Sequence, residues 1–314
     1  MPYSDRMQRN HLYSVFFAPR GLARLCDLGL QIAQQYLSPF DKLIGIVGKA
    51  GSGKSMFIKG MFPGLELTND DTGVNVRPLP LLSAVEDNVG FYSPHTYHVD
   101  IHFEAAFTQM HALATAIEDA IAIGKRVVVE HFDLIRPFMT MNAHLLVGIG
   151  EEVIVTRPNA FGPEPKAIAN IVHKSQKYRL RSHSAEDLCV SFLHKKGIED
   201  YSHGDVRNGF ILRFQQKPDI ALDELEVYVN EMIAKDLPIS FKDDYHILIG
   251  DEVLYCSAPR MHVASTSEIK KFSLIKEWIF DPISRTYLLT GVTGDKMLNQ
   301  LSEINKIEAT LEQT

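Results

Sequence analysis

One short segment of the chain has the residue types that bind phosphate. Residues 48–55 read GKAGSGKS, and an apolar run, Leu43 to Val47, comes directly before them. Glycines let backbone N–H groups turn toward a ligand, and the N-terminus of a following helix adds positive potential. Lys54 can reach the β- and γ-phosphates of a nucleotide, and the hydroxyl of Ser55 can bind Mg²⁺. The residues predicted to hold the nucleotide are Gly48, Gly51, Ser52, Gly53, Lys54 and Ser55.

A carboxylate that helps to hold Mg²⁺ should follow a buried strand next to this segment. The apolar run Val127 to Val129 predicts such a strand, and Glu130 comes directly after it. Glu130 is therefore the predicted second Mg²⁺ ligand, and Asp133 is the alternative. Either residue could also be an ordinary charged residue at the end of a strand.

The full pattern GxxxxGK[ST] resembles the Walker A loop of P-loop NTPases and kinases. The resemblance implies that ATP and Mg²⁺ are the cofactors and that Lys54 and Glu130 act in catalysis. In kinases of small molecules, a carboxylate in the segment after the first helix often orients the acceptor or acts as a base. Asp70 and Asp71 lie in that segment, and Asp71 is the predicted catalytic residue.

An alternating stretch of polar and apolar residues runs from Tyr97 to Glu104. As a strand it would place His98, Asp100, His102 and Glu104 on one face. Such a row is either a site for a metal or substrate or the solvated face of a strand, and the sequence leaves both interpretations open.

The second half of the chain carries four motifs in order. From His262 the sequence reads H-V-x-x-T-x-E-I-x-x-F, and Cys256 comes shortly before it; upstream are HSAEDL (183–188), GDVRNGF (204–210) and LDELEVYVNEMIAKDLPIS. Together these motifs resemble the second additional domain of threonyl- and alanyl-tRNA synthetases, over residues 170–292. The resemblance implies an α+β editing-type domain in which the cysteine and histidine face a metal or the editing pocket.

This chain departs from that family at two positions. Asp187 stands where the family has the second histidine of HxxxH, and Cys256 and His262 are six residues apart instead of four. His183, Asp187, Cys256 and His262 can still form a tetrahedral Zn²⁺ site, because the HxxxD spacing places two of them on one face of a helix. The alternative is a binding scaffold that kept the fold without the metal, and His203 is expected to be structural.

The elements that must position these residues fall into two predicted domains. The three prolines of residues 157–166 predict a boundary between an α/β parallel-sheet P-loop domain over 1–160 and an α+β editing-like domain over 161–314. Apolar periodicity predicts helices over 21–37, from Ser52, over 104–123, 166–196 and 222–235, and through Met297 to Leu311. It predicts strands over 43–47, 127–129, 152–155, 210–214, 246–249 and 253–255.

The composition limits the partners. A net charge of −7 over 314 residues argues against a surface that coats duplex nucleic acid, although residues 173–181 (HKSQKYRLR) form one basic segment. Three cysteines give no disulfide framework and indicate a reducing compartment. No apolar run approaches the roughly 18 residues that a membrane helix needs. We therefore expect a cytoplasmic protein without a membrane partner.

Three functions are consistent with these features. The first is a P-loop phosphotransferase that moves the γ-phosphoryl group of ATP to a nucleoside or another small acceptor. The second is a metal-dependent deacylase of alanyl- or threonyl-type tRNA that is gated by ATP and binds tRNA phosphates through the basic segment. The third is a non-catalytic, nucleotide-dependent RNA-binding module. The sequence does not decide the acceptor, the choice between ATP and GTP, or the oligomeric state.

Overall fold

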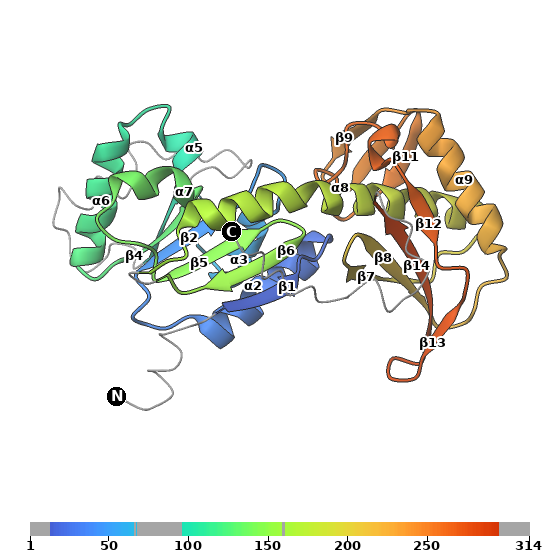
Figure 1. Cartoon of the computed structure of the whole chain (residues 1–314), viewed down its shortest axis with the longest axis horizontal. Helices are drawn as coiled ribbons and strands as arrows, with labels where there is room; N and C mark the ends of the chain where they lie inside the picture. The colour runs from blue at the N-terminus through green and yellow to red at the C-terminus, as the bar shows by residue number, and fades with distance from the viewer. Residues whose placement is uncertain (1–12, 66, 68–95, 159–160, 295–314) are drawn as a thin grey trace. The chain divides into compact units, whose positions relative to one another are not determined.

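The computed structural model describes residues 13–65, 67, 96–158 and 161–294. The chain divides into two compact units, and each is described by itself (Figure 1). The N-terminal unit consists of Met1–Ala18 and Leu22–Gln176, and the C-terminal unit consists of Pro19–Gly21 and Lys177–Thr314. The units divide inside a helix and not at the prolines of residues 157–166, because the helix that begins at Pro165 contributes to both of them.

A six-stranded mixed sheet forms the centre of the N-terminal unit. Its strands are β1 (Tyr13–Phe17), β2 (Leu43–Val47), β3 (Thr96–Asp100), β4 (Arg126–Glu130), β5 (Leu145–Ile149) and β6 (Glu152–Thr156). Strands β5-β2-β4-β3 run parallel in this order, and β6 and then β1 follow β5 in antiparallel pairing. The strand predicted over 152–155 is confirmed as β6, but it does not run parallel as the predicted parallel sheet implied, because the short connection from β5 to β6 allows only a hairpin.

Helices cover both faces of this sheet, which explains the continuous apolar runs of β2 and β5. The helical elements are α2 (Leu22–Tyr36), α3 (Lys54–Met61), α5 (Ile101–Glu104), α6 (Met110–Ala122), α7 (Phe132–Ile135), η1 (Arg136–Phe138) and α8 (Pro165–Lys195). On one face Ile44 and Val128 belong to a core with residues of α2 and α3. On the other face Val127 and Leu146 belong to a core with residues of α6 and the start of α8.

The parallel strands bring three segments to one edge of the sheet. Strand β2 leads into the glycine-rich loop at Gly48, β3 ends at Asp100, and β4 ends at Glu130. Asp100 and Glu130 are direct partners in the strand register. Ligands of open α/β sheets bind at the carboxyl ends of parallel strands, so this edge is the expected place for a site.

The stretch from Tyr97 to Glu104 is not one strand. Strand β3 ends at Asp100, whose carboxylate accepts hydrogen bonds from the N–H groups of His102 (2.9 Å) and Phe103 (3.3 Å) and so caps α5. The predicted row of four polar side chains on one strand face is therefore wrong. The helix predicted over 104–123 correspondingly begins later, as α6.

The C-terminal unit combines two antiparallel sheets with the second part of α8, helix α9 (Leu222–Ala234) and the short helix η2 (Thr266–Ile269). Its strands are β7 (Ser202–Val206), β8 (Gly209–Phe214), β9 (Ile239–Asp243), β10 (His246–Ile249), β11 (Glu252–Tyr255), β12 (Phe272–Leu274), β13 (Ile279–Asp281) and β14 (Thr286–Thr293). One sheet has the order β12-β14-β8-β7, with β13 paired to β14, and the other has the order β11-β10-β9. The core between these elements includes Leu188, Phe210, Leu225 and Ile247.

The predicted helices over 21–37, 166–196 and 222–235 are confirmed as α2, α8 and α9. Asp70, Asp71 and the helix predicted through Met297 to Leu311 lie outside the described residues. Over the part of the chain that the structure describes, no helix is both long and apolar enough to cross a membrane. All three cysteines are free.

Candidate functional site

The loop between β2 and α3 turns tightly through glycines. Gly51 and Gly53 have φ angles of 73° and 86°, in the left-handed region that glycine adopts without steric cost. A Cβ atom at Gly53 would lie 2.3 Å from Leu25 Cδ2, so no other residue fits there without a shift. Helix α3 begins at Lys54, and its N-terminus therefore opens onto this loop.

Lys54 and Ser55 lie against Glu130 at the end of β4. Lys54 Nζ is 3.7 Å from Glu130 Oε2 and donates to the carbonyl oxygen of Lys49 at 3.2 Å. Ser55 Oγ is 3.5 Å from Glu130 Oε1. The structure thus brings together the lysine, hydroxyl and carboxylate that the sequence predicted, although Glu130 is 75 residues from Ser55 along the chain.

Glu130 is held as an anion. Its Oε1 atom lies 3.1 Å from Nε2 of His98, which comes from the neighbouring strand β3. Burial raises the pKa of Glu130, but the hydrogen bond and charge of His98, together with Lys54, outweigh burial and lower it. A buried anion beside a serine hydroxyl is a suitable cation ligand. The alternative ligand, Asp133, lies in α7, and burial raises its pKa.

The sequence placed Asp100 only in a polar row that was either a site or a solvated strand face, and did not pair it with Glu130. Asp100 is 6% exposed, and burial and then the neighbouring Glu130 carboxylate raise its pKa above the ordinary value. One ligand atom from each of Asp100, Glu130 and His131 lies within 4.8 Å of the others. The signal in the sequence was the end of the alternating stretch, where a capping aspartate marks the carboxyl end of a strand.

His131 follows Glu130 in the left-handed backbone region, with φ 58° and ψ 43°. Its ring stacks on that of His102, with centroids 4.0 Å apart and an angle of 26° between the planes. Burial, the charge of Lys54 and the charge of His102 lower the pKa of His131 to about 3. Its imidazole is therefore neutral at physiological pH and keeps a nitrogen lone pair for a ligand.

A second cluster lies in the C-terminal unit and contains the four residues predicted as a zinc site. His183 and Asp187 come from one face of α8, and Cys256 and His262 come from the segment between β11 and η2. One ligand atom from each of these residues lies within 4.8 Å of all the others. Cys256 Sγ is 3.3 Å from His183 Nε2 and 3.8 Å from His262 Nε2, and His262 Nε2 is 2.7 Å from Asp187 Oδ2.

These distances test whether zinc fits the cluster. Zn–N bonds of about 2.0 Å and Zn–S bonds of about 2.3 Å place tetrahedral ligand atoms about 3.3–3.6 Å apart. The two distances from Cys256 Sγ are close to this range, and the contact between Asp187 and His262 needs to open by about 0.6 Å. Burial lowers the pKa of His183, which favours the neutral ring that binds metal. The donor set and spacing therefore fit zinc.

Neighbouring groups orient these ligands. Nδ1 of His262 lies 3.2 Å from the carbonyl oxygen of Pro259 and can donate to it, which leaves Nε2 for the cluster. Burial and then the Asp187 carboxylate raise the pKa of the Cys256 thiol, and the N–H group of Ala258, which donates to Sγ at 3.3 Å, opposes them only in part. Nδ1 of His183 has no hydrogen-bond partner among the described residues and lies 3.9 Å from Glu186 Oε2.

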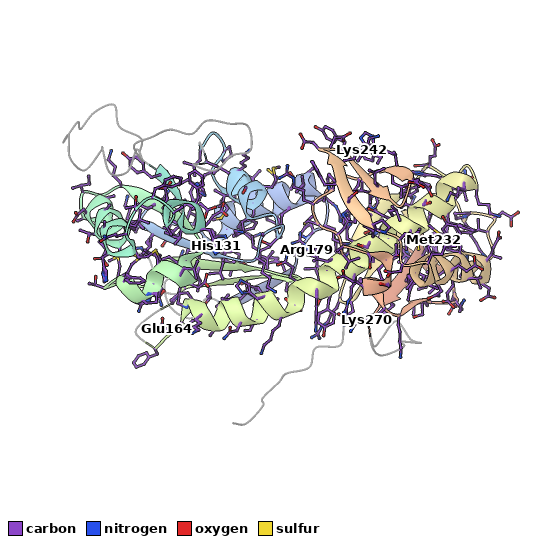
Figure 2. The ribbon with its side chains drawn as sticks, turned by 90° about the horizontal axis from the view of Figure 1, so that it is seen from above. His131, Glu164, Arg179, Met232, Lys242 and Lys270 are labelled. Carbon is purple, nitrogen blue, oxygen red and sulfur yellow. The ribbon has the colours of Figure 1, made fainter. Side chains whose placement is uncertain are left out.

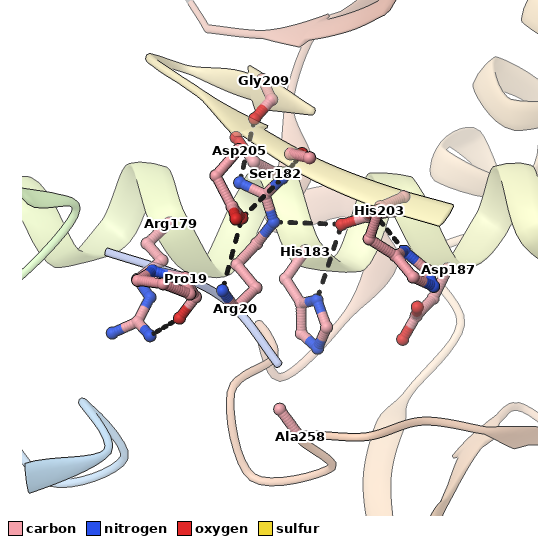
Figure 3. A network of polar contacts seen from close by, with 12 residues as sticks. Pro19, Arg20, Arg179, Ser182, His183, Asp187, His203, Asp205, Gly209 and Ala258 are labelled. Atoms are coloured by element: carbon pink, nitrogen blue, oxygen red, sulfur yellow. Dashed lines mark hydrogen bonds and ion pairs between the residues drawn. The ribbon is translucent and has the colours of Figure 1, made fainter. Parts of the chain in front are cut away.

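Glu186 is the centre of a buried network that the sequence did not predict, and Figure 3 labels its partners Arg20, His183 and His203. Arg20, from the segment Pro19–Gly21, contacts Glu186 Oε2 through Nε at 3.0 Å, and His203 Nδ1 lies 2.7 Å from Glu186 Oε1. Arg20 also donates to the carbonyl oxygens of Gly209 and Gly204, each at 2.9 Å. Burial raises the pKa of Glu186, but Arg20 and the histidines outweigh burial and hold it well below the usual range.

The basic segment over 173–181 is not a continuous cationic surface. Arg179 is 1% exposed and donates to the carbonyl oxygen of Pro19, and Arg181 is 9% exposed. Two of the four cations that were expected to bind tRNA phosphates are therefore buried.

The comparisons with known proteins add no relative: no protein-family model matches the chain, and no curated protein is significantly similar to it. The function is therefore inferred from the two clusters themselves.

Proposed function

We propose that the N-terminal unit is a phosphotransferase that uses ATP with a divalent ion and a small acceptor bearing a hydroxyl group, such as a nucleoside. The observation that carries this proposal is Asp100, a second buried carboxylate beside Glu130 at the edge of the sheet. A nucleotide-binding switch needs one carboxylate for its metal. A second carboxylate with a raised pKa, next to the phosphate loop, suits a general base for an acceptor hydroxyl.

Each group at the nucleotide site has its own role in the proposed reaction. The glycine-rich loop and the N-terminus of α3 bind the phosphates, and Lys54 neutralises charge on the transferred group. Ser55 and Glu130 hold the divalent ion, which when bound neutralises charge on the β- and γ-phosphates. Asp100 orients the acceptor hydroxyl and accepts its proton. The hydroxyl of Ser55 and the carboxylate of Glu130 are oxygen ligands that suit Mg²⁺.

Phosphoryl transfer is tested with a panel of nucleosides and small polyols, ATP and Mg²⁺, by mass spectrometry of the products. Asp100→Asn should lower the turnover by about 10²–10⁴-fold, the usual contribution of a general base. Its affinity for a non-hydrolysable ATP analogue should stay close to that of the wild type. Tight binding of the analogue with no phosphorylated product from any acceptor would refute the transferase.

The second candidate function belongs to the C-terminal unit. We infer that His183, Asp187, Cys256 and His262 bind one zinc ion, because these four side chains converge from α8 and the segment after β11. When bound, zinc could activate water or polarise the carbonyl of an aminoacyl ester. Four protein ligands leave no open position, and all four side chains are buried, so a structural zinc is the stronger expectation.

Metal analysis of untagged protein separates these possibilities. We expect about one zinc per chain in the wild type and a large loss in Cys256→Ala. Hydrolysis of alanyl- or threonyl-type mischarged tRNA by the zinc-loaded protein, lost in the same variant, would establish the deacylase. Full zinc occupancy without hydrolysis would leave the cluster structural.

A further inference from the structure

We propose that His131 is a metal ligand of the nucleotide site, so that this site takes a 3d divalent ion such as Mn²⁺ in preference to Mg²⁺. This inference rests on the proposed phosphotransferase, since it concerns the ion that accompanies the nucleotide. The sequence predicted only Ser55 and Glu130 as ligands, both of them oxygen donors. The imidazole adds a nitrogen donor to the same edge of the sheet.

The cluster geometry places two proposed protein ligands, Glu130 and His131, beside the proposed base Asp100. Asp100 ends β3, Glu130 ends β4 in direct register with it, and His131 follows at once. One polar atom from each of the three lies within 4.8 Å of the others, so an ion held by Glu130 and His131 would lie beside the Asp100 carboxylate. Ser55 Oγ, 3.5 Å from Glu130 Oε1, can reach the same ion. The cluster belongs entirely to the N-terminal unit.

The backbone at His131 is a second, independent observation. Its φ of 58° is in the left-handed region, where glycine is the least costly residue and a non-glycine residue marks strain that often accompanies function. The sequence nonetheless has a histidine at this position, directly after the predicted metal ligand Glu130. Figure 2 labels His131. The stack on His102 holds the ring in one orientation. A side chain kept in a costly backbone conformation and fixed by stacking is consistent with a ligand role.

The ligand set determines the metal preference. Mg²⁺ is a hard ion that takes oxygen ligands and keeps several waters, so an imidazole contributes little to its binding. The 3d ions from Mn²⁺ to Zn²⁺ accept imidazole, with affinities that rise along the series to Cu²⁺. One carboxylate, one hydroxyl and one imidazole therefore select against Mg²⁺ relative to Mn²⁺. Mn²⁺ is the useful probe, because its unpaired electrons report on nitrogen ligands.

The test compares the full-length wild type with His131→Gly, His131→Asn and His102→Ala. Glycine suits the left-handed backbone, so His131→Gly removes the imidazole without adding strain. His131→Asn also tolerates this backbone region but offers an amide in place of the ring. His102→Ala removes the stacking partner and leaves the proposed ligand in place, which separates packing from coordination.

Two measurements are made with a non-hydrolysable ATP analogue, and only metal that binds in its presence is counted. In the wild type, pulsed electron paramagnetic resonance of bound Mn²⁺ should show ¹⁴N coupling, and Mn²⁺ should bind about tenfold or more tightly than Mg²⁺. In His131→Gly and His131→Asn, the imidazole coupling should disappear, and the Mn²⁺/Mg²⁺ preference should fall about tenfold, mostly through weaker Mn²⁺ binding. His102→Ala should keep the coupling.

The possible outcomes separate this inference from the proposed function. If the wild type binds the analogue with Mn²⁺ but its spectrum shows no ¹⁴N coupling, His131 is not a ligand. That outcome does not contradict the proposed phosphotransferase. Coupling that persists unchanged in His131→Gly also overturns the ligand role of His131, because another nitrogen would then be the ligand. If the wild type binds the analogue with neither ion, the proposed phosphotransferase is itself refuted.

Discussion

Removal of the Arg20 guanidinium should destabilise the C-terminal unit strongly. Arg20 and Glu186 are 3% and 1% exposed, and Arg20 also satisfies two backbone carbonyl groups and contacts Asp205 at 3.2 Å. Arg20→Met would leave Glu186 as a buried carboxylate beside Asp187, with only the histidines near it. Loss of one partner of a buried ion pair costs about 3–5 kcal/mol. For a unit of this size, that corresponds to a decrease of roughly 10–20 °C in the unfolding midpoint.

The protein contains its own probe for this measurement. Trp278 is the single tryptophan of the chain, packs against the core of the C-terminal unit and forms an edge contact with Phe214. Urea unfolding followed by tryptophan fluorescence therefore reports on the C-terminal unit alone. Lys196→Met is the matched control, because it breaks a shorter but exposed ion pair, 2.7 Å from Glu224. We expect that control to cost less than about 1 kcal/mol.

A double variant and a pH series test the cause of the effect. Arg20→Met combined with Glu186→Leu should be more stable than Arg20→Met alone, because it leaves no unpaired carboxylate at position 186. The pKa of Glu186 is lowered from its ordinary 4.5 in the folded state. Its contribution is therefore present above pH 4.5 and is lost as the pH falls below that value, and Glu186→Gln should flatten this part of the profile. Equal effects of Arg20→Met and Lys196→Met would refute the reasoning.

Three further predictions concern the two clusters. Gly53→Ala should weaken binding of the ATP analogue at least about tenfold by calorimetry, because φ is 86° and the new Cβ would meet Leu25; an unchanged affinity would contradict the loop geometry. Lys54→Met should lower the affinity about tenfold or more through the lost phosphate contact, while Lys59→Met, at the far end of α3, serves as its control. Removal of zinc by a chelator should lower the Trp278-reported midpoint of the wild type and leave that of Cys256→Ala nearly unchanged; equal decreases in both would show that the cluster does not hold the metal.

Local patterns in the sequence predicted the parts of the fold that depend on local physics. The glycine spacing and the flanking apolar run located the loop and β2, and the spacing of His183 and Asp187 located one face of α8. Strand β5 was missed, although its residues are all buried, because an apolar run of five residues has no periodicity that separates a strand from part of a helix. Strand β1 was missed because it lies at the edge of the sheet, and its alternating pattern is short.

The missing site residues depend on contacts between distant segments. Arg20 and Glu186 are 166 residues apart, and nothing near either of them in the sequence indicates a partner. Asp100 became a site residue only when β3 paired with β4 and aligned it with Glu130. His131 drew no attention because the sequence does not show that its backbone is left-handed. Strand register and backbone conformation therefore decide which residues join Glu130 in the N-terminal cluster, whereas the four residues of the C-terminal cluster were all named from sequence motifs.

The two clusters differ in a way that bears on where the chemistry occurs. The cluster of Asp100, Glu130 and His131 lies beside the glycine-rich loop, and an ion held by Ser55, Glu130 and His131 would keep coordination positions for nucleotide and water. The other cluster offers four ligand residues, and neighbouring backbone groups contact two of them, Ala258 N–H at Cys256 Sγ and the Pro259 carbonyl oxygen at His262 Nδ1. A metal there would join α8 to the segment before η2 and close its own coordination sphere. We therefore infer that the N-terminal unit catalyses the reaction and that a metal ion bound in the C-terminal unit would stabilise the fold of that unit.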